Sequence, residues 1–327
     1  MSYIQWIRGH VGRRRIFLVF ATVVLRDDRG RILLQRRTDF NFWGLPGGAL
    51  EIDEDIETCA RRELAEETGL AAGDLHLVGV YTDPRYDVTY PNGDLVQQFT
   101  ICFEGIASSG RMQPDGSETT HQQFFAPAAI PYAQMPIWYR DMVHDALAYR
   151  DALAGGPPRF LLPYSNGRLQ DQIARVRPFI GRQRYIGAGA MVVVVRDDGR
   201  VLLIQRHDPE GYWAFPAGFC DLGENVAHAA VRETREETGL HVEPERIVGV
   251  YSAPAYHYTY ANGDRIKNVG VLFRARLLGG VPQVETAEIR QMAWLTVAEA
   301  RQRLPSGPFG QLFQMALAYL DEDCFVC

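Results

Sequence analysis

The sequence predicts an α/β protein with two tandem domains, each an α/β/α sandwich in which helices flank a mixed β-sheet. Three observations lead to this prediction. A unit of about 150 residues, an ordinary domain size, occurs twice in the 327-residue chain. Within each copy, apolar β-branched runs alternate with stretches of helical period. Each copy then closes with an amphipathic helix.

A constant spacing relates the two copies. Residues 43–70 align with residues 213–240 at an offset of 170, and the alignment continues without a gap through residues 79–94. Upstream, one inserted residue shifts the offset to 169. Glycine, proline and asparagine cluster at 154–167, as expected of a linker. We therefore predict a first domain over residues 1–155, a linker over 156–168 and a second domain over 169–327.

The first strand of each copy is the most apolar element. Residues 17–25 and 190–195 are nearly continuous β-branched runs, which is typical of strands buried on both faces. A second strand and a glycine-rich stretch follow, and then a helix expected over 55–68, with Gly69 suited to cap its C-terminus. Two further strands around an Asn-Gly turn form a predicted hairpin. The closing helices are expected at 137–153 and 309–321.

Composition and charge restrict the classes of partner. With 46% hydrophobic and 23% charged residues, the chain is typical of a soluble globular protein. Its formal net charge of −6 argues against a nucleic-acid or anionic-membrane binder, so neither partner is expected. The apolar run at 16–25 follows basic residues as in a signal peptide, but it is too short to span a bilayer. We interpret it as a buried strand and place the protein in the cytoplasm.

The five cysteines do not form a disulfide scaffold. Cys324 and Cys327 make a single CxxC at the C-terminus. Without a second pair, a zinc site is not expected, and a fraying tail is the better interpretation.

Three glutamates crowd one face of the helix expected over 55–68. At about 100° per residue, Glu63, Glu66 and Glu67 fall within one arc of about 100°. Like charges at these spacings destabilise a helix by about 0.2–0.5 kcal/mol per pair. Either the face is simply solvated, or a hard divalent cation with oxygen ligands relieves the repulsion. The three glutamates alone leave both interpretations open.

The surrounding residues favour the cation. The spacing G-x5-E-x7-R-E-(aliphatic)-x-E-E-x-G-(aliphatic) is the Nudix box, and because both copies carry it, the chain resembles a tandem Nudix hydrolase over nearly its whole length. One position departs from the pattern: Thr234 takes the aliphatic slot that Leu64 fills in the first copy, which we expect to affect stability at most. The box comprises Gly48, Glu54, Arg62, Glu63, Leu64, Glu66, Glu67, Gly69 and Leu70, and again Gly218, Glu224, Arg232, Glu233, Thr234, Glu236, Glu237, Gly239 and Leu240.

The resemblance implies hydrolysis of a nucleoside diphosphate linked to another moiety, with Mg²⁺ or Mn²⁺ as cofactor. By position, Arg62 and Arg232 would orient the glutamates, while Glu54 and Glu224 would pair with those arginines to hold the loop. The cations would neutralise charge on the pyrophosphate and generate a hydroxide-like nucleophile. The implied metal ligands are Glu63, Glu66, Glu67 and the carbonyl of Gly47, and in the second copy Glu233, Glu236, Glu237 and the carbonyl of Ala217.

A general base outside the box is common in the family that the chain resembles. Glu118 and Glu288 lie in register with each other, on loops before a late strand, where that family often places an acidic residue. We therefore take both as candidate bases. An exposed loop carboxylate is the alternative interpretation of each.

The substrate is the least determined part of the prediction. Pro84 and Pro254 lie fourteen residues beyond the box, near the place of a proline in ADP-ribose pyrophosphatases, so ADP-ribose or a similar nucleotide sugar is favoured. Aromatic and basic residues near the box either contact the base and phosphates or, more often in hairpins, serve packing and solvation. These residues are Tyr81, Tyr86, Tyr90, Tyr251, Tyr256, Tyr258, Tyr260, Trp43, Trp213, Arg36 and Arg206.

Three alternatives stay open. An NTP pyrophosphohydrolase or a dinucleoside polyphosphate hydrolase would use the same scaffold, and a nucleotide sensor would bind without cutting. In a third arrangement one copy is catalytic and the other completes its pocket, because the predicted linker is long enough for the two domains to pack as an intrachain pseudo-dimer. In every case the expected partner is a small-molecule nucleotide.

Overall fold

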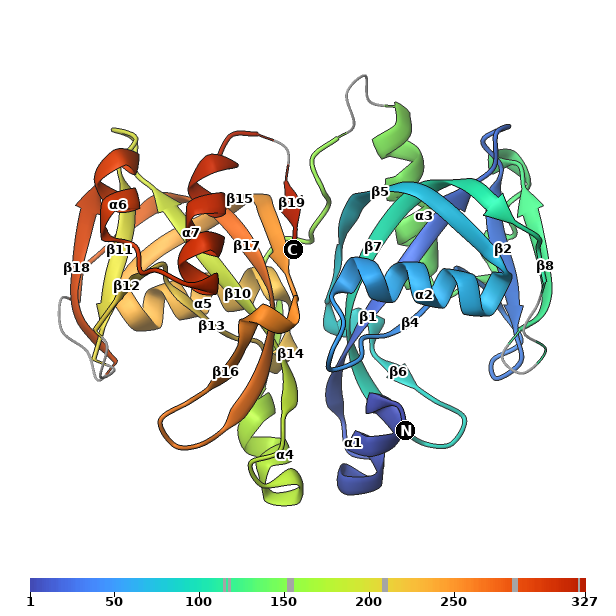
Figure 1. The fold of residues 1–327 in the computed structure, drawn as a ribbon, viewed down its shortest axis with the longest axis horizontal. Helices are drawn as coiled ribbons and strands as arrows, with labels where there is room; N and C mark the ends of the chain where they lie inside the picture. The colour runs from blue at the N-terminus through green and yellow to red at the C-terminus, as the bar shows by residue number, and fades with distance from the viewer. Residues whose placement is uncertain (114–115, 117–118, 152–155, 208–210, 284–287, 323) are drawn as a thin grey trace. The chain divides into compact units, whose positions relative to one another are not determined.

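The computed structural model describes the whole chain except residues 114–115, 117–118, 152–155, 208–210, 284–287 and 323. Its internal contacts divide the chain into two compact units (Figure 1). Unit 1 consists of residues 1–159 with 178–181, and unit 2 of residues 160–177 with 182–327. The predicted limits of the two domains and of the linker stay predictions.

A mixed sheet forms the centre of unit 1. Its strand order is β3-β2-β1-β7-β5, in which β1 and β7 run parallel from the pair Ile16 and Val96 to the pair Arg26 and Ile106, while β2 and β5 pair antiparallel with their neighbours. The short strands β4, β6 and β8 extend it by pairing with β1, β7 and β2. The bounds are β1 (Ile16–Arg26), β2 (Ile32–Arg37), β3 (Trp43–Gly44), β4 (Gly47–Ala49), β5 (Leu70–Tyr81), β6 (Val88–Thr89), β7 (Leu95–Gly110) and β8 (Thr119–Phe125).

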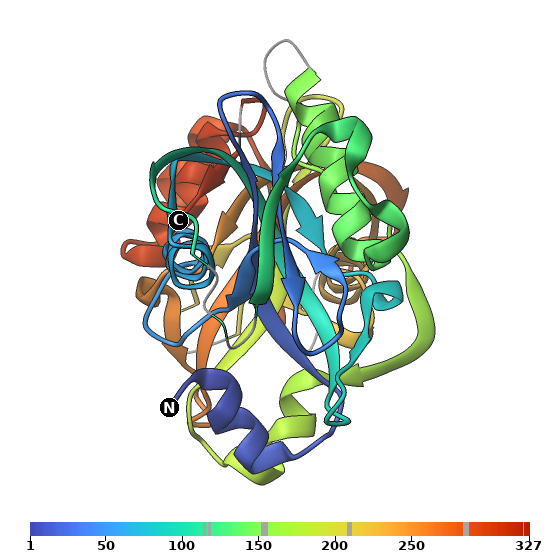
Figure 2. The same cartoon turned by 90° about the vertical axis from the view of Figure 1, so that its right-hand side faces the viewer.

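Two helices cover the two faces of this sheet. α2 (Ile56–Thr68) contacts β1, β4 and β5, and α3 (Ile137–Asp151) packs against β5 and β1 from the other side. Figure 2 shows the strands between these two helices. The α/β/α layering predicted from the sequence is therefore confirmed. The remaining helical elements are α1 (Tyr3–Val11) and the 3₁₀ turns η1 (Pro84–Tyr86), η2 (Pro127–Ala129) and η3 (Tyr132–Gln134).

Unit 2 repeats this architecture. Its sheet order is β12-β11-β10-β17-β15-β19, with β10 and β17 again parallel, and α5 packs on β10, β13 and β15. The bounds are β9 (Ser165–Asp171), β10 (Tyr185–Val195), β11 (Val201–Arg206), β12 (Trp213–Ala214), β13 (Ala217–Phe219), β14 (Asp221–Glu224), β15 (Leu240–Tyr251), β16 (His257–Thr259), β17 (Arg265–Gly280), β18 (Ile289–Leu295) and β19 (Phe325–Val326), with α4 (Gln172–Ile180), α5 (Val226–Thr238), η4 (Pro254–Tyr256), α6 (Val297–Arg303) and α7 (Pro308–Ala318).

The box helix α2 has the ends that its local sequence predicts. The Asp55 side chain accepts a hydrogen bond from the Thr58 amide and caps the first turn. Gly69 ends the helix with a φ of 71°, a left-handed conformation that glycine adopts without strain. The predicted helix over 55–68 is thus confirmed, because both of its signals are local.

The C-terminal tail corrects a prediction. Instead of fraying, Phe325 and Val326 pair in parallel with Gly249 and Val250 at the edge of the unit 2 sheet. The Cys327 carbonyl also accepts a hydrogen bond from the Ser252 amide. A tail that supplies its backbone groups to an open sheet edge is ordered by those bonds. No helix in the described part of the chain is long and apolar enough to cross a membrane.

Candidate active site

An arginine–glutamate clamp fixes the loop before α2 in unit 1. Arg62 donates to both carboxylate oxygens of Glu54, from Nε at 3.0 Å and from Nη2 at 2.6 Å. The same Nη2 reaches the Ala49 carbonyl at 3.2 Å. Although burial raises the pKa of Glu54, the hydrogen bond from Arg62 brings it below its usual value, so Glu54 stays charged. The loop between β4 and α2 is held by this pair.

Arg62 also contacts two of the three clustered glutamates. Its Nη1 donates to Glu63 at 2.6 Å and to Glu66 at 3.1 Å. The Glu63 carboxyl lies directly against Gly48, where a Cβ atom would collide with it. A glycine is therefore required at this position for Glu63 to lie against the loop. Glu66 is mostly exposed on the same side of α2.

Glu67 is the buried member of the cluster, only 5% exposed. Its carboxylate accepts hydrogen bonds from the Gly47 amide and from the Gln35 side chain, both at 2.8 Å, and neither donor carries a charge. The Gln122 amide bonds to the Glu67 carbonyl at 2.6 Å and so steadies the backbone. Burial raises the pKa of Glu67 to about 7. This carboxylate therefore lacks a full counter-charge.

Unit 2 builds the same clamp with one addition. Arg232 bonds to Glu224 at 2.6 Å, to Glu233 at 2.7 Å and to Glu236 at 3.0 Å. The fully buried Glu224 also interacts with His228 Nδ1 at 2.6 Å. The departure at Thr234 is accommodated, because its buried hydroxyl donates to the Ala230 carbonyl.

Glu237, the counterpart of Glu67, has a different environment. The Ala217 amide donates to it at 3.0 Å, but its second partner is the guanidinium of Arg206 at 2.7 Å. Arg206 extends further to Glu288 at 3.1 Å and so links the box helix to the loop before β18. Burial again raises the pKa of Glu237 to about 7. Glu118, the predicted counterpart of Glu288, lies outside the described residues.

The difference between these environments lies in which residues occupy matching positions of two paired strands, because the register is the same in both units. In unit 1, Gln35 on β2 lies opposite Gln122 on β8, whereas the corresponding pair in unit 2 is Ile204 and Met292. Sequence reasoning missed these residues. The repeat contained a signal for them. At matching positions, two polar residues in one copy are replaced by two apolar residues in the other.

The structural counterpart of Arg206 is Arg37, the last residue of β2. Arg37 makes a two-bond pair with Asp39 at 2.8 and 2.9 Å, and its charge lowers the pKa of Glu67 from a distance. Arg36, which the sequence suggested beside Arg206, bonds to Asn41 and Gln134 and lies over Trp43. The structure therefore does not bring Arg36 or Trp43 to the glutamates.

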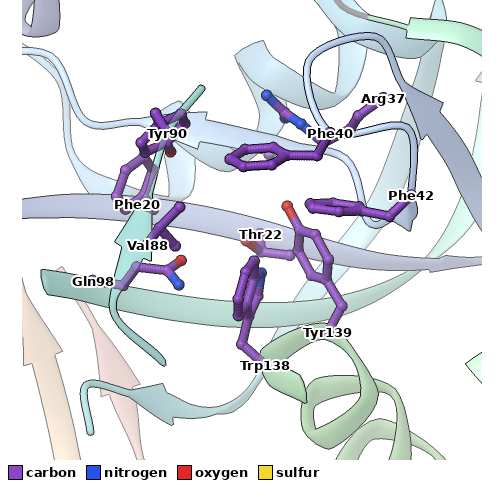
Figure 3. A pocket seen from close by; sticks show the side chains of 11 residues that line it. Phe20, Thr22, Arg37, Phe40, Phe42, Val88, Tyr90, Gln98, Trp138 and Tyr139 are labelled. Carbon is purple, nitrogen blue, oxygen red and sulfur yellow. The ribbon is translucent and has the colours of Figure 1, made fainter. Parts of the chain in front are cut away.

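Two of the unit 1 tyrosines serve packing. Tyr81 and Tyr86 are buried and donate to Asp145 and Asp141 of α3 at 2.9 and 2.6 Å. Tyr90 differs, because it lines a pocket of about 50 Å³ that also includes Gly47 of the box loop (Figure 3). The other lining residues are Phe20, Thr22, Arg37, Phe40, Phe42, Val88, Gln98, Trp138 and Tyr139.

The chemistry of the glutamate cluster fits a hard divalent cation. Carboxylates and a backbone carbonyl are the oxygen ligands that Mg²⁺ prefers, and a cation would supply the counter-charge that Glu67 lacks. In the described part of the chain, no three His, Cys, Asp or Glu side chains are gathered as a metal site. In unit 1 Arg62 engages Glu63 and Glu66, while Glu67 bonds to Gly47 and Gln35.

Comparison with known proteins gives the family. The model of the NUDIX domain matches residues 17–146 and 186–313. A MutT-like protein of Streptomyces ambofaciens is 38% identical over 112 residues, 34% of this chain and 65% of that protein. An ADP-ribose pyrophosphatase of Methanocaldococcus jannaschii is 44% identical over 63 residues, 19% of this chain and 37% of that protein. The 8-oxo-dGDP phosphatase NUDT18 of Homo sapiens is 30% identical over 135 residues, 39% of this chain and 38% of that protein.

The chain spans less than two thirds of the length of each of these three relatives. The family itself rests on the domain model, whose two matched segments together cover more than half of the chain. They include both helices α2 and α5 with their glutamates. The protein therefore belongs to the NUDIX domain family and carries the family's domain twice.

Proposed function

We propose that the protein hydrolyses the pyrophosphate bond of a nucleoside diphosphate derivative, with ADP-ribose or a nucleotide sugar as the favoured substrate. One observation carries the reaction class: three glutamates lie along one helix face beside a glycine-rich loop, and Arg62, which Glu54 holds, bonds to two of them. The name of the archaeal relative, an ADP-ribose pyrophosphatase, supports the choice of substrate. The proposed partner of the protein is accordingly a small-molecule nucleotide.

The proposed cofactor is Mg²⁺ or Mn²⁺. In unit 1 it would be held by Glu63, Glu66 and Glu67 with the carbonyl of Gly47. In unit 2 the corresponding ligands are Glu233, Glu236 and Glu237 with the carbonyl of Ala217. When bound, a divalent cation neutralises phosphate charge and lowers the pKa of a coordinated water.

The other residues of the site would act on the glutamates and on the attacking water. Arg62 and Arg232 would hold the glutamates in place through their fixed positions beside Glu54 and Glu224. Glu288 is the proposed general base in unit 2, because Arg206 brings it beside Glu237. Its counterpart Glu118 is proposed for unit 1 on the sequence repeat alone.

A substrate panel tests the proposal. The full chain with Mg²⁺ is incubated with ADP-ribose, ADP-glucose, dinucleoside polyphosphates and NTPs, and released nucleoside monophosphate, pyrophosphate and phosphate are separated by chromatography. AMP from ADP-ribose, lost on chelation of the metal, is the expected result. Measurable binding without turnover of any member would replace the enzyme by a nucleotide sensor.

A second candidate function is hydrolysis of a nucleoside di- or triphosphate. The human relative is named an 8-oxo-dGDP phosphatase, and aromatic rings of the kind on which a nucleobase can stack line the pocket that includes Gly47 of the box loop. Preference for an NTP over ADP-ribose in this panel, or for 8-oxo-dGDP added to it, would select this candidate. If a dinucleoside polyphosphate is the best substrate, the protein is instead a dinucleoside polyphosphate hydrolase.

A further inference from the structure

Two cysteines that the proposed function does not use, Cys324 and Cys327, flank the strand β19. Both are half-buried. The other three cysteines of the chain are fully buried, namely Cys59, Cys102 and Cys220. Because thiol reactivity depends on access, an oxidant in solution reaches the pair beside β19 before it reaches the buried thiols.

Backbone hydrogen bonds hold β19 at the edge of the unit 2 sheet, beside β15 (Figure 1). The Cys327 amide donates to the Val250 carbonyl at 3.0 Å, and the Cys327 carbonyl accepts from the Ser252 amide at 2.6 Å. The Tyr256 hydroxyl lies 3.0 Å from Cys327 Sγ. The position of Cys327 therefore depends on the docking of β19.

Phe325 anchors the strand through its side chain. It is 6% exposed, and its ring centroid lies 5.4 Å from that of Tyr319, which follows α7. The ring also lies directly over Gly249 of β15, where a Cβ atom would approach it to 2.5 Å. The missing side chain of Gly249 therefore makes room for Phe325.

The docked strand keeps the two cysteines too far apart for a disulfide. Phe325 and Val326 are both extended, and a strand rises about 3.3 Å per residue, so the Cα atoms of the two cysteines are about 10 Å apart. A disulfide needs Cα atoms about 4.4–6.8 Å apart, which a tight turn of four residues provides. Formation of the bond therefore requires β19 to give up its strand conformation and its pairing with β15.

We propose that Cys324 and Cys327 form a reversible dithiol–disulfide site whose oxidation releases β19 from the unit 2 sheet. The co-reactant is a small disulfide such as glutathione disulfide. One cysteine thiolate attacks a sulfur of this oxidant, which forms a mixed disulfide and displaces one glutathione. The second cysteine thiolate then attacks the protein sulfur of the mixed disulfide and displaces the other glutathione. Each glutathione thiolate takes up the proton that a cysteine has lost.

Docking of β19 and oxidation of the pair exclude each other, so each disfavours the other by the same factor. The ring of Phe325 belongs to the hydrophobic core of unit 2, and its burial favours the dithiol. Any substitution that weakens docking must therefore shift the equilibrium toward the disulfide. This requirement separates the proposed site from two thiols that oxidise independently of the fold.

Unit 1 offers a matched control, because the equivalent sheet edge is occupied by Arg159. The Arg159 carbonyl accepts from the Val80 amide at 2.9 Å, and the Arg159 amide donates to the Val78 carbonyl at 2.8 Å. Gly79, the counterpart of Gly249 in the repeat, faces the Arg159 backbone, which a Cβ atom would approach to 2.5 Å. Crowding this edge disturbs a docked segment without touching the CxxC pair.

Equilibration in glutathione buffers tests the site without substrate or metal. The full chain is held in chelator at a series of ratios of reduced to oxidised glutathione, quenched with acid and alkylated, and the disulfide is quantified by mass spectrometry. Phe325→Ala and Gly249→Ala should each raise the equilibrium constant for oxidation at least about tenfold, whereas Gly79→Ala should leave it unchanged. An unchanged constant in either docking variant, an equal rise in Gly79→Ala, or mixed disulfides without the internal bond would overturn the proposal.

Amide hydrogen exchange, followed by NMR, measures release of the strand directly. In the oxidised chain the amides of Ser252 and Cys327 should exchange at least about tenfold faster than in the reduced chain, because both donate across the edge between β15 and β19. The double variant Cys324→Ser, Cys327→Ser should keep the slow exchange in the same oxidant. Unchanged protection of the two amides in fully oxidised protein contradicts the proposal, whether or not the protein hydrolyses a nucleotide.

Discussion

The two copies of the box share their geometry but differ in the charge around the last glutamate. In both, an arginine bound to the glutamate of the preceding loop engages the next two carboxylates. Glu67 then meets the neutral Gln35, whereas Glu237 meets the guanidinium of Arg206. Unit 1 thus has a buried carboxylate without a full counter-charge, and unit 2 supplies a cation from its own strand.

This difference shows what the motif does and does not determine. The box fixes where the carboxylates stand on the helix, because all of its residues are near in sequence. Residues on the neighbouring strands decide whether a carboxylate is accessible to a metal, and these residues differ between the copies. We therefore expect unit 1 to carry most of the turnover, an expectation that substitutions in matched pairs can break.

The largest expected effect separates Glu67→Gln from Glu237→Gln. Loss of Glu67 should lower kcat/KM about a thousandfold, or about 4 kcal/mol, if unit 1 performs the reaction. Loss of Glu237 should cost less than about tenfold, because Arg206 already occupies that carboxylate. Steady-state kinetics on the best substrate of the panel measures both. A larger loss in Glu237→Gln would assign catalysis to unit 2.

Substitution of Arg206 and of its counterpart Arg37 compares how much each guanidinium stabilises its own carboxylate. Arg206→Gln leaves Glu237, 4% exposed, without its charged partner, and we expect unfolding in urea with a chelator to show a loss of about 3 kcal/mol. Arg37→Gln breaks the more exposed pair with Asp39 and removes a charge that acts on Glu67 only from a distance, so it should cost about 1 kcal/mol or less.

Added Mg²⁺ extends this comparison. It should restore part of the stability of Arg206→Gln, since a divalent cation can replace the guanidinium at Glu237. Equal losses in the two arginine variants would mean that Arg206 is no more important to its carboxylate than Arg37 is to Asp39.

A pH series tests whether burial or the charged partner controls the two glutamates. Burial raises the pKa of both Glu67 and Glu237 to about 7, so each binds its proton more tightly in the folded than in the unfolded chain. The stability of metal-free protein should therefore be fully present below about pH 4.5 and fall as the pH rises through 7, by about 3 kcal/mol for each residue.

Glu67→Gln and Glu237→Gln should each remove their own share of this decline. The free energy of unfolding, measured in chelator from pH 4.5 to 8, gives the slopes. Similar slopes in the two variants would show that desolvation outweighs Arg206. A flat wild-type profile would contradict the raised pKa values.

Elements whose ends are set by residues adjacent in sequence were predicted correctly, whereas elements without such local signals were missed. The helix over 55–68 was predicted to its ends because Asp55 and Gly69 act on adjacent residues. α1 was missed even though Ser2 and Gln5 form a capping box, since nine residues give little periodicity. The docked tail was missed because a two-residue strand has no pattern of its own.

For the site, too, the contacts made within one loop and helix were predictable, and the contacts made by other strands were not. The placement of Arg62 beside Glu54 follows from the family's spacing within one loop and helix. Gln35 and Gln122 come from other strands, so only the fold brings them to Glu67. The sequence comparison paired Arg36 with Arg206, but the strand pairing makes Gln205 the counterpart of Arg36. Because successive side chains of a strand point to opposite faces, this error of one residue placed Arg36 on the wrong face of the sheet.

The smallest expected effect lies in the clamp itself. His228 interacts with the buried Glu224 in unit 2, whereas Thr58 at the same place in unit 1 bonds to the exposed cap Asp55. Loss of one hydrogen bond to a buried carboxylate that keeps its arginine should cost about 1 kcal/mol in His228→Ala, and Thr58→Ala should cost a few tenths. Urea unfolding of the two variants decides the comparison. If they lose equally little, Arg232 alone saturates Glu224 and the two clamps are equivalent, so the difference between the copies lies in the partners of Glu67 and Glu237.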